Sequence, residues 1–202
     1  MRRNDVISYA SSLSGEAGHT EVLRIYNSQK TLPRGYAVRL NDPWCATFVS
    51  ACFLKCGYSD ISECSCDQMI KKAKALGIWV EDDKYEATPG DVLLYDWSDS
   101  SNNYATTDNT GSADHVGIIT SIDNNSYKII EGNKNKAIGT RVIAKNGRFI
   151  RGFITPPYEA EASSNKDKVI ERIEGVDIDT LYKLKGAQGV KNEMIRIVKE
   201  GV

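Results

Sequence analysis

The sequence offers one clear pairing for covalent chemistry, a cysteine thiol with a histidine imidazole. It holds five cysteines and two histidines, so a thiol hydrolase built from this chain must recruit His19 or His115. Cys45 follows the polar loop that ends at Pro43 and opens an apolar stretch that predicts a helix. In the first turn of a helix, free backbone N–H groups and the positive end of the helix dipole stabilise a thiolate. Position therefore makes Cys45 the candidate nucleophile, whereas an inert buried thiol is the better interpretation of Cys52.

His115 is the candidate base, and the next predicted strand supplies groups that could orient it. That strand runs into Glu131 and Asn133. If the two strands pair as a hairpin whose residue numbers sum to about 248, Asn133 lies opposite His115 and Glu131 lies diagonal to it, all on one face. A carboxylate there would hold the imidazole in one tautomer. A tight two-residue turn at Asn124-Asn125 would reverse the parity and separate the groups, so the sequence leaves both geometries open.

The elements that must position these residues are helices first and strands after, an order typical of an α+β domain. Periodicity predicts helices at 4–13, 20–30, 44–56 and 64–76, and strands at 91–97, 115–121, 127–131, 138–144 and 148–155. The gaps between the strands from 115 onward are short and rich in Asn, Asp and Gly, which indicates an antiparallel meander, whereas 98–113 is a longer polar loop. The segment 44–56 is apolar nearly all round, with Asp42 as its predicted cap and Pro43 in its first turn. We therefore expect this helix to be buried on the sheet.

Composition argues against two classes of partner. The net charge of −1 indicates no basic face for duplex nucleic acid. The longest apolar run falls far below the roughly 20 residues that a membrane-spanning helix needs. Asp5 and Ser8 interrupt the N-terminal segment where a signal peptide would need an apolar core, so we expect synthesis in the cytoplasm without one. Five cysteines, an odd number, fit reduced thiols better than a disulfide framework.

Four short motifs along residues 4–158 resemble those of a known family. In order, they are Pro43-Trp44-Cys45-Ala46-Thr47-Phe48-Val49-Ser50, Pro89-Gly90-Asp91-Val92-Leu93, Asp114-His115-Val116-Gly117-Ile118 and Glu131-Gly132-Asn133. Together they resemble the CHAP family, the cysteine- and histidine-dependent amidohydrolases/peptidases, and in particular phage or prophage endolysins of Gram-positive bacteria. The resemblance implies a papain-like fold, with the cysteine on the central helix and the histidine on the sheet. It also implies that Cys45 is the nucleophile, His115 the base, Glu131 the orienting acid and Asn133 a polar assistant.

The same resemblance implies a substrate and a route to it. The activity would be cleavage of an amide bond in peptidoglycan, either the sugar–peptide amide or a bond in a stem or bridge peptide. An endolysin without a signal peptide would reach the cell wall through holin-type pores. No cofactor is implied as required, although some relatives bind calcium. The acidic residues between Asp96 and Asp114 could hold calcium through oxygen ligands, but they do not follow EF-hand spacing, and a solvated loop is the alternative.

Several other residues have both a functional and a plain interpretation. Trp44 and Trp97 flank the predicted site and could stack against sugar or peptide. His19 has no partner nearby in sequence and is interpreted as a surface residue. The remaining cysteines match no common zinc module, so we interpret them as packing residues rather than metal ligands; they are Cys52, Cys56, Cys64 and Cys66.

The chain divides into a domain and a tail. Residues 1–158 form the predicted CHAP-like catalytic domain, which Pro156-Pro157 ends. Residues 159–165 are a polar linker. Residues 166–202 hold short helical patterns broken by glycines, too few to form much core alone. This tail is either a wall-binding or oligomerisation element or a helical segment cut short, and the oligomeric state is left open.

Two other functions compete with the peptidoglycan hydrolase. A papain-like cysteine protease acting inside the cell would share the catalytic residues and differ only in its groove, which the sequence does not resolve. A module that binds wall peptides without cutting them would usually have lost the cysteine or the histidine. Both residues are present here.

Overall fold

The computed structural model describes residues 1–82, 84–97, 112–145, 147, 149–159, 192, 195 and 196. The chain forms two compact units, Met1–Glu159 and Ala160–Val202. The predicted linker at 159–165 and tail at 166–202 lie almost wholly outside the described residues, so both stay predictions. The first unit carries every candidate site residue.

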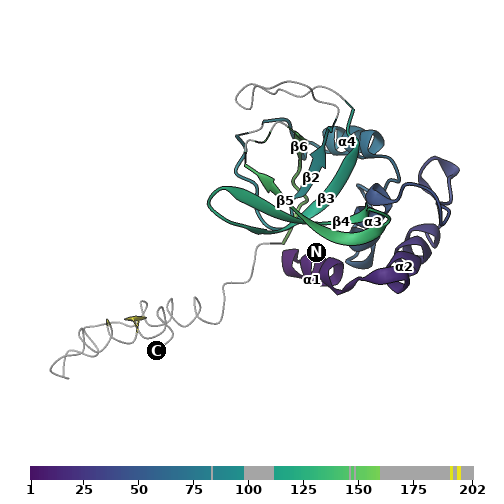
Figure 1. Ribbon diagram of the computed structural model, residues 1–202, viewed down its shortest axis with the longest axis horizontal. Coiled ribbons are helices and arrows are strands. Elements are labelled where there is room, and N and C mark those ends of the chain that lie inside the picture. The colour runs from purple at the N-terminus through teal and green to yellow at the C-terminus, as the bar shows by residue number, and fades with distance from the viewer. Residues whose placement is uncertain are drawn as a thin grey trace. The chain divides into compact units, whose positions relative to one another are not determined.

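The described part of this unit is built from helices and one antiparallel sheet (Figure 1). The helices are α1 (Arg3–Ser12), α2 (Gly15–Asn27), α3 (Cys45–Lys55) and α4 (Cys66–Ala75), with a short 3-10 turn η1 (Pro33–Gly35). The strands are β1 (Trp79–Val80), β2 (Val92–Tyr95), β3 (His115–Ile122), β4 (Ser126–Lys134), β5 (Ala137–Ala144) and β6 (Ile150–Ile154). The predicted α+β, papain-like fold is confirmed, with the helix that bears Cys45 packed on the sheet.

α3 is buried along most of its length, as its apolar sequence predicts. Every residue from Cys45 to Phe53 is buried. The predicted cap is wrong, because Trp44 is the N-cap residue and no side chain caps the helix. The Asp42 carboxylate instead accepts hydrogen bonds from the Arg39 backbone N–H and the Tyr36 hydroxyl, both at 2.8 Å. Asp42 therefore fixes the preceding loop, and among the described residues no side-chain hydrogen bond caps the start of α3, next to Cys45.

The strands follow the order β1-β6-β2-β3-β4-β5, and every pair is antiparallel. Strands β2 to β5 form the predicted meander. β6 departs from it by crossing back to pair with β2, and the two-residue β1 pairs with β6. Burial explains the difference, because every residue of β6 is buried whereas β5 alternates between exposed and half-buried positions. β6 therefore takes an inner place in the sheet and β5 stays at its edge.

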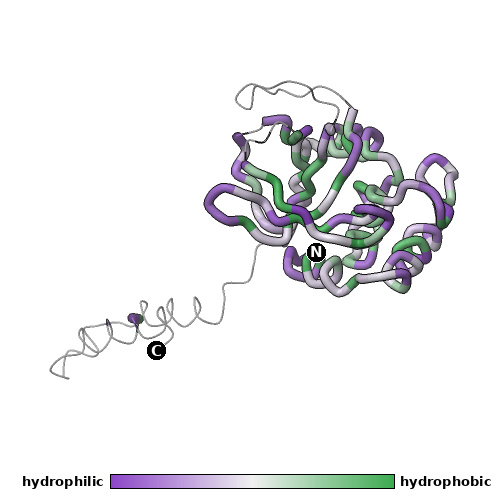
Figure 2. Tube along the Cα trace, viewed as in Figure 1, coloured by the Kyte–Doolittle hydropathy of each residue, from purple (hydrophilic) through white to green (hydrophobic). Residues whose placement is uncertain are grey.

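The sheet carries apolar side chains on both faces. Leu94 and Val116 belong to the core that α3 completes, together with residues of α1, α2 and α4. Leu93 and Tyr95 belong to a second core on the opposite face. Figure 2 shows the apolar segments concentrated in the inner strands and α3, with hydrophilic segments in the connecting loops and the outer hairpin. β2 and β3 are therefore buried on both sides.

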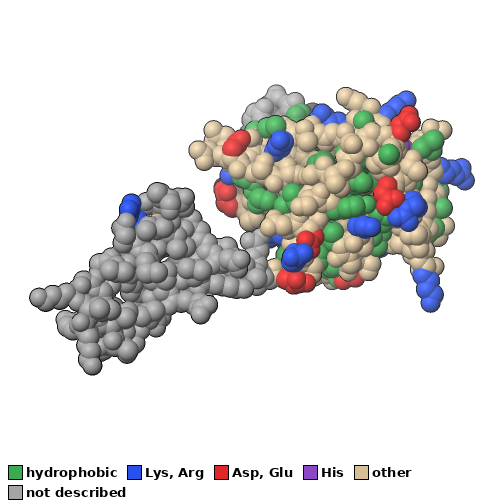
Figure 3. Space-filling model, turned by 90° about the horizontal axis from the view of Figure 1, so that it is seen from below, with side chains coloured by type: hydrophobic (Ala, Val, Ile, Leu, Met, Phe, Trp, Pro, Cys, Tyr) green, Lys and Arg blue, Asp and Glu red, His purple; other side chains and the backbone are tan. Residues whose placement is uncertain are grey.

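The surface of the first unit has a mixed character. On the face seen in Figure 3, acidic and basic side chains lie interspersed among apolar and neutral ones. This distribution accords with the net charge of −1. Among the described helices, none combines the length and the apolar character needed to cross a lipid bilayer.

Candidate active site

α3 begins where β3 starts and β4 ends, and a glycine allows this close approach. A Cβ on Gly132 would meet Phe48 Cβ at 2.5 Å and Trp44 Cζ3 at 2.7 Å. Only a residue without a side chain fits such a contact, because real Cβ atoms do not approach that closely. Gly132 therefore lets the end of β4 pack directly on the first turn of α3. Cys45, 7% exposed, is held beside the ends of both strands.

The turn between β3 and β4 has the geometry that the sequence analysis identified as unfavourable. Asp123 donates its backbone N–H to Ser126 O at 3.0 Å, which closes a two-residue loop at Asn124-Asn125. Continued without interruption, this register would place His115 and Glu131 on opposite faces of the sheet.

A β-bulge in β3 reverses that parity. The ladder shifts by one residue between Ile119 and Ser121, and beyond the shift Ile118 pairs with Ile130. A bulge inserts a single extra residue into one strand, so the side chains beyond it exchange faces relative to the partner strand. The predicted register is therefore reached through a bulge and not through a longer loop.

The restored register brings His115 and Glu131 together. Gly117 lies against Glu131, since a Cβ on Gly117 would meet Glu131 Cβ at 3.2 Å and Ile130 O at 2.8 Å. The missing side chain leaves room for the imidazole of His115, two residues earlier on the same face. His115 Nε2 lies 2.5 Å from Glu131 Oε2. At this distance the two groups form an ion pair when His115 is protonated. The angle between them is not that of a hydrogen bond, and neither His115 Nε2 nor Glu131 Oε2 has another hydrogen-bond partner among the described residues.

Glu131 has a second partner that the sequence analysis did not predict. Its Oε1 accepts a hydrogen bond from Arg141 Nε at 2.6 Å. The Glu131 side chain is fully buried, and a buried carboxylate requires such charged partners. The β4–β5 turn at Asn135-Lys136 has φ values of 53° and 65°, and its register pairs Arg141 with Ile129, diagonal to Glu131. Two positive φ angles are typical of a type I′ turn, but that turn continued without interruption would pair Arg141 with Ile130 and place it on the opposite face from Glu131. A register shift between Glu131 and Lys134 brings Arg141 to the face of Glu131.

The imidazole of His115 is shared between Glu131 and the thiol of Cys45. The Cys45 sulfur lies 3.8 Å from Cys66 Sγ, and the imidazole of His115 also acts on it. The contact with Cys66, together with His115 and the Ala46 N–H, lowers the pKa of Cys45 to about 5 against the opposing effect of burial. Burial lowers the pKa of His115, but the contacts with Cys45 and Glu131 outweigh that effect and raise the pKa of His115 to about 9. At neutral pH the pair is therefore a thiolate and an imidazolium.

This arrangement has the parts of a thiol-dependent acyl-transfer site. The thiolate of Cys45 is the attacking group. The protonated His115 can give a proton to a leaving amine, and Glu131 stabilises that protonated form. The uncapped N-terminus of α3 offers backbone N–H groups to an oxyanion beside the sulfur.

A groove of about 860 Å³ runs along α2 and the β4–β5 turn. Its lining includes Trp44, the residue before Cys45. Asn133 lines it, at the end of β4 and with a φ of 59°. Asn133 thus lies beyond the paired part of the β3–β4 ladder, and its predicted role stays a prediction. His19 also lines the groove and stacks on Trp44, with ring centroids 4.0 Å apart. His19 thus has an aromatic partner that lies far from it in sequence, and it is half-buried rather than fully exposed.

The two predicted stacking residues are both occupied by protein neighbours. Trp44 borders the groove but is only 2% exposed, because His19 covers one face of its ring. Trp97 stacks on Tyr95 with centroids 4.9 Å apart, and the guanidinium of Arg141 lies 4.9 Å from the Trp97 ring centre. The described contacts thus favour a supporting role for both indoles, Trp44 in the groove wall and Trp97 behind Arg141.

The calcium hypothesis falls mostly on residues that the structure does not describe. Asp99, Asp108 and Asn109 lie in the undescribed stretch 98–111. Of the described acids, Asp114 accepts the backbone N–H of Trp97 at 2.8 Å, and Asp96 is buried. Within the described residues, no group of three or more His, Cys, Asp or Glu side chains is arranged to hold a metal ion. Calcium binding therefore stays a prediction.

Comparison with known proteins yields one match. The family model described as CHAP domain matches residues 36–133, a range that contains Cys45, His115, Glu131 and Asn133. Searches of curated proteins and of solved structures returned no significant match. The matched range ends before β5, so Arg141 lies outside it.

Proposed function

We propose that this chain, whose residues 36–133 match the CHAP domain model, is a cysteine- and histidine-dependent amidohydrolase/peptidase that hydrolyses an amide bond of bacterial peptidoglycan. The observation that carries the proposal is the contiguous set Cys45, His115 and Glu131 at the uncapped start of α3. Endolysin action, at a sugar–peptide amide or at a stem or bridge peptide bond, is the form of this activity that the sequence motifs favour.

The proposed reaction runs through a thioester. The Cys45 thiolate attacks the amide carbonyl carbon, and the first N–H groups of α3 stabilise the oxyanion. His115 then donates its proton to the departing amine, which leaves an acyl group on the Cys45 sulfur. A water molecule gives a proton back to His115 and attacks the thioester, releasing the carboxylic acid and the free thiolate. Glu131 keeps its negative charge throughout and balances the imidazolium.

The alternatives differ from this proposal in substrate or in catalysis. A protease acting on folded or unfolded proteins would use the same residues. A wall-peptide-binding module would keep the groove beside Trp44 but would not need a thiolate. The low pKa of Cys45 and the high pKa of His115 favour a reactive centre over a binding module.

Digestion of purified peptidoglycan tests the proposal and identifies the bond. We expect soluble fragments, with termini that mass spectrometry can assign. New free amines on amino acids would mean endopeptidase cleavage, whereas intact stem peptides released from muramic acid would mean amidase cleavage. Casein incubated in parallel is the control for general proteolysis. Cleavage of casein with intact peptidoglycan would contradict the proposal and favour the protease.

The ion pair predicts a bell-shaped dependence of kcat/KM on pH. The reactive form needs Cys45 deprotonated and His115 protonated. Its population therefore falls as pH drops through about 5, the pKa of Cys45, and as pH rises through about 9, the pKa of His115. Both limbs belong to the coupled pair rather than to either residue alone. We expect a plateau between these values in the release of soluble fragments, with circular dichroism at each pH to separate titration from unfolding. A single rising limb near pH 7 would instead indicate a neutral thiol–imidazole pair.

A further inference from the structure

A second cysteine lies against the candidate nucleophile, and the family match assigns it no role. Cys66 is the first residue of α4, buried, with its Sγ 3.8 Å from that of Cys45. We infer that Cys66 is a positioning residue whose thiol donates a hydrogen bond to the Cys45 sulfur and so stabilises the reactive thiolate. The inference rests on the proposed function only in taking Cys45 as the nucleophile.

The direction of this hydrogen bond follows from where the protons are. Cys45 lies at the uncapped start of α3 and beside His115, whose positive charge favours a thiolate on Cys45, so Cys45 has no proton to donate. The hydrogen bond to Cys45, burial and the neighbouring Cys45 charge raise the pKa of Cys66, which therefore keeps its S–H. Two thiolates at this separation would repel each other in a region that water hardly reaches, so only one of them ionises. Cys66 is thus the donor and Cys45 the acceptor.

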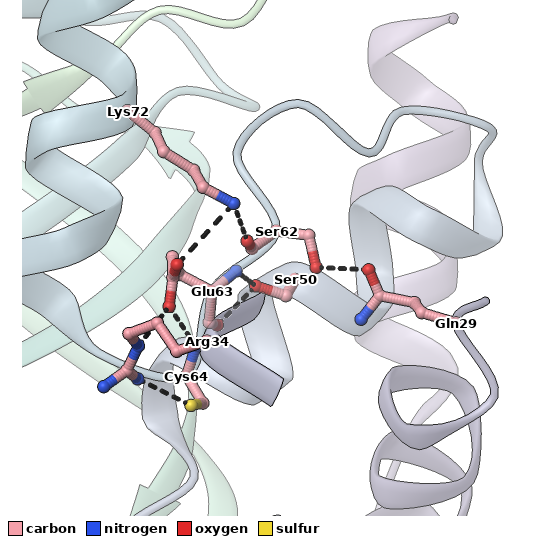
Figure 4. Close-up of polar contacts among 7 residues, drawn as sticks. All are labelled: Gln29, Arg34, Ser50, Ser62, Glu63, Cys64 and Lys72. Atoms are coloured by element: carbon pink, nitrogen blue, oxygen red, sulfur yellow. Dashed lines mark hydrogen bonds and ion pairs between the residues drawn. The ribbon is translucent and has the colours of Figure 1, made fainter. Parts of the chain in front are cut away.

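The segment before α4 is held to α3 through the backbone of Glu63, whose buried carboxylate contacts η1 and α4, and this fixes where Cys66 can lie (Figure 4). Glu63 accepts a hydrogen bond from Arg34 Nε at 3.3 Å, and its Oε1 lies 3.6 Å from Lys72 Nζ. The Ser50 hydroxyl, on α3, donates to Glu63 O at 2.7 Å and accepts the Glu63 N–H at 2.8 Å. Ser50 lies on the same helix as Cys45. The reciprocal bonds therefore set the position of Cys66 relative to Cys45.

A further contact ties the first turn of α4 to the strand that carries the base. Asp67 Oδ1 accepts the backbone N–H of Ala113 at 3.0 Å, two residues before His115. The Cys66 thiol is thus held between α3 and the start of β3. Among the described residues, the titratable groups that act on the two sulfurs are His115 from β3, Asp67 from α4 and Asp114 before β3. The two aspartates disfavour a thiolate on Cys66, which again leaves the negative charge on Cys45.

Substitutions of Cys66 can distinguish a packing role from a hydrogen-bond donor role, because the two roles predict different effects for the same variants. If Cys66 only fills space, valine serves as well as cysteine and serine costs stability. If Cys66 donates, serine retains the donor whereas alanine and valine lose it. The variants therefore rank in opposite orders for the two roles.

The experiment measures the alkylation of Cys45 by iodoacetamide as a function of pH, followed by peptide mass spectrometry on the full chain. We expect Cys66→Ala to raise the midpoint of Cys45 labelling by about one pH unit, which is about tenfold less thiolate on the acid side. Cys66→Val should shift the midpoint as Cys66→Ala does. It replaces Cys66→Ala in the comparison if the alanine variant does not fold. Cys66→Ser should stay close to the wild type. Cys56→Ala is the matched control, because it removes a cysteine at the far end of α3, and its midpoint should not move.

The acid limb of peptidoglycan hydrolysis should shift with the labelling midpoint in Cys66→Ala, while the rate near pH 8 stays close to wild type. A structural loss would lower the rate at every pH instead. An unchanged midpoint in Cys66→Ala and Cys66→Val, or a Cys66→Ser midpoint shifted as far as theirs, would overturn the role of Cys66. Labelling needs no substrate, so a shifted midpoint in a protein that leaves peptidoglycan intact would contradict the proposed function alone.

Discussion

Replacing Cys45 with alanine should reduce peptidoglycan hydrolysis by about 10³-fold or more, because the covalent step loses its nucleophile. Cys45→Ser should not restore the rate. A hydroxyl is far less acidic than a thiol, so the contacts that lower the pKa of Cys45 to about 5 cannot ionise a serine at neutral pH. Release of soluble fragments from purified walls measures the loss, and thermal unfolding checks that the variants stay folded.

Cys52→Ala is the matched control for this prediction. Cys52 lies on the same helix and is fully buried, and burial raises its pKa well above that of a free thiol. Its removal should leave hydrolysis close to wild type while costing some stability through the small cavity it creates. Iodoacetamide should label Cys45 much faster than Cys52 near neutral pH. Hydrolysis by Cys45→Ala at about a tenth of the wild-type rate would rule out thiol chemistry.

The sequence predicted the elements of this fold well because their patterns are local. The apolar segment from Cys45 identified α3, and short gaps rich in Asn and Gly identified the hairpins from β3 to β5. The place of β6 depends on a long-range choice between pairing with β5 and pairing with β2. β6 pairs with β2 because all its side chains are buried there, and no local sequence pattern predicts this pairing.

The sequence predicted the catalytic residues of the site but not the β-bulge that brings them together. The hairpin turn at Asn124-Asn125 gives the wrong parity, and a bulge before Ser121 corrects it. Nothing in the local sequence marks that bulge. Cys66 and Arg141 were missed for a related reason, since each reaches the site from an element whose position depends on tertiary packing.

Changing Glu131 to glutamine should lower kcat/KM by about 10²-fold or more, in line with typical acid–base contributions. The amide keeps the shape of the side chain but removes the charge 2.5 Å from His115 Nε2. That charge helps to raise the pKa of His115 to about 9, so the variant's basic limb should move to lower pH. The guanidinium of Arg141, left without its carboxylate, would act in the same direction by disfavouring a second positive charge nearby.

A carboxylate–arginine pair on the far side of the sheet separates this effect from a general loss of stability. Glu81 Oε1 accepts a hydrogen bond from Arg151 at 2.6 Å, just after β1 and well away from β4. Glu81→Gln removes the charge from an arginine contact of the same length at a more exposed position, so it should lower stability slightly without moving either limb of the pH profile. If Glu131→Gln behaves like Glu81→Gln, with an unshifted basic limb and near wild-type turnover, Glu131 holds Arg141 in place and does not orient His115. If the basic limb moves only in Glu131→Gln, the negative charge acts on the imidazole itself. The bulge in β3 is then what makes catalysis possible, because it alone brings that charge to the face of His115.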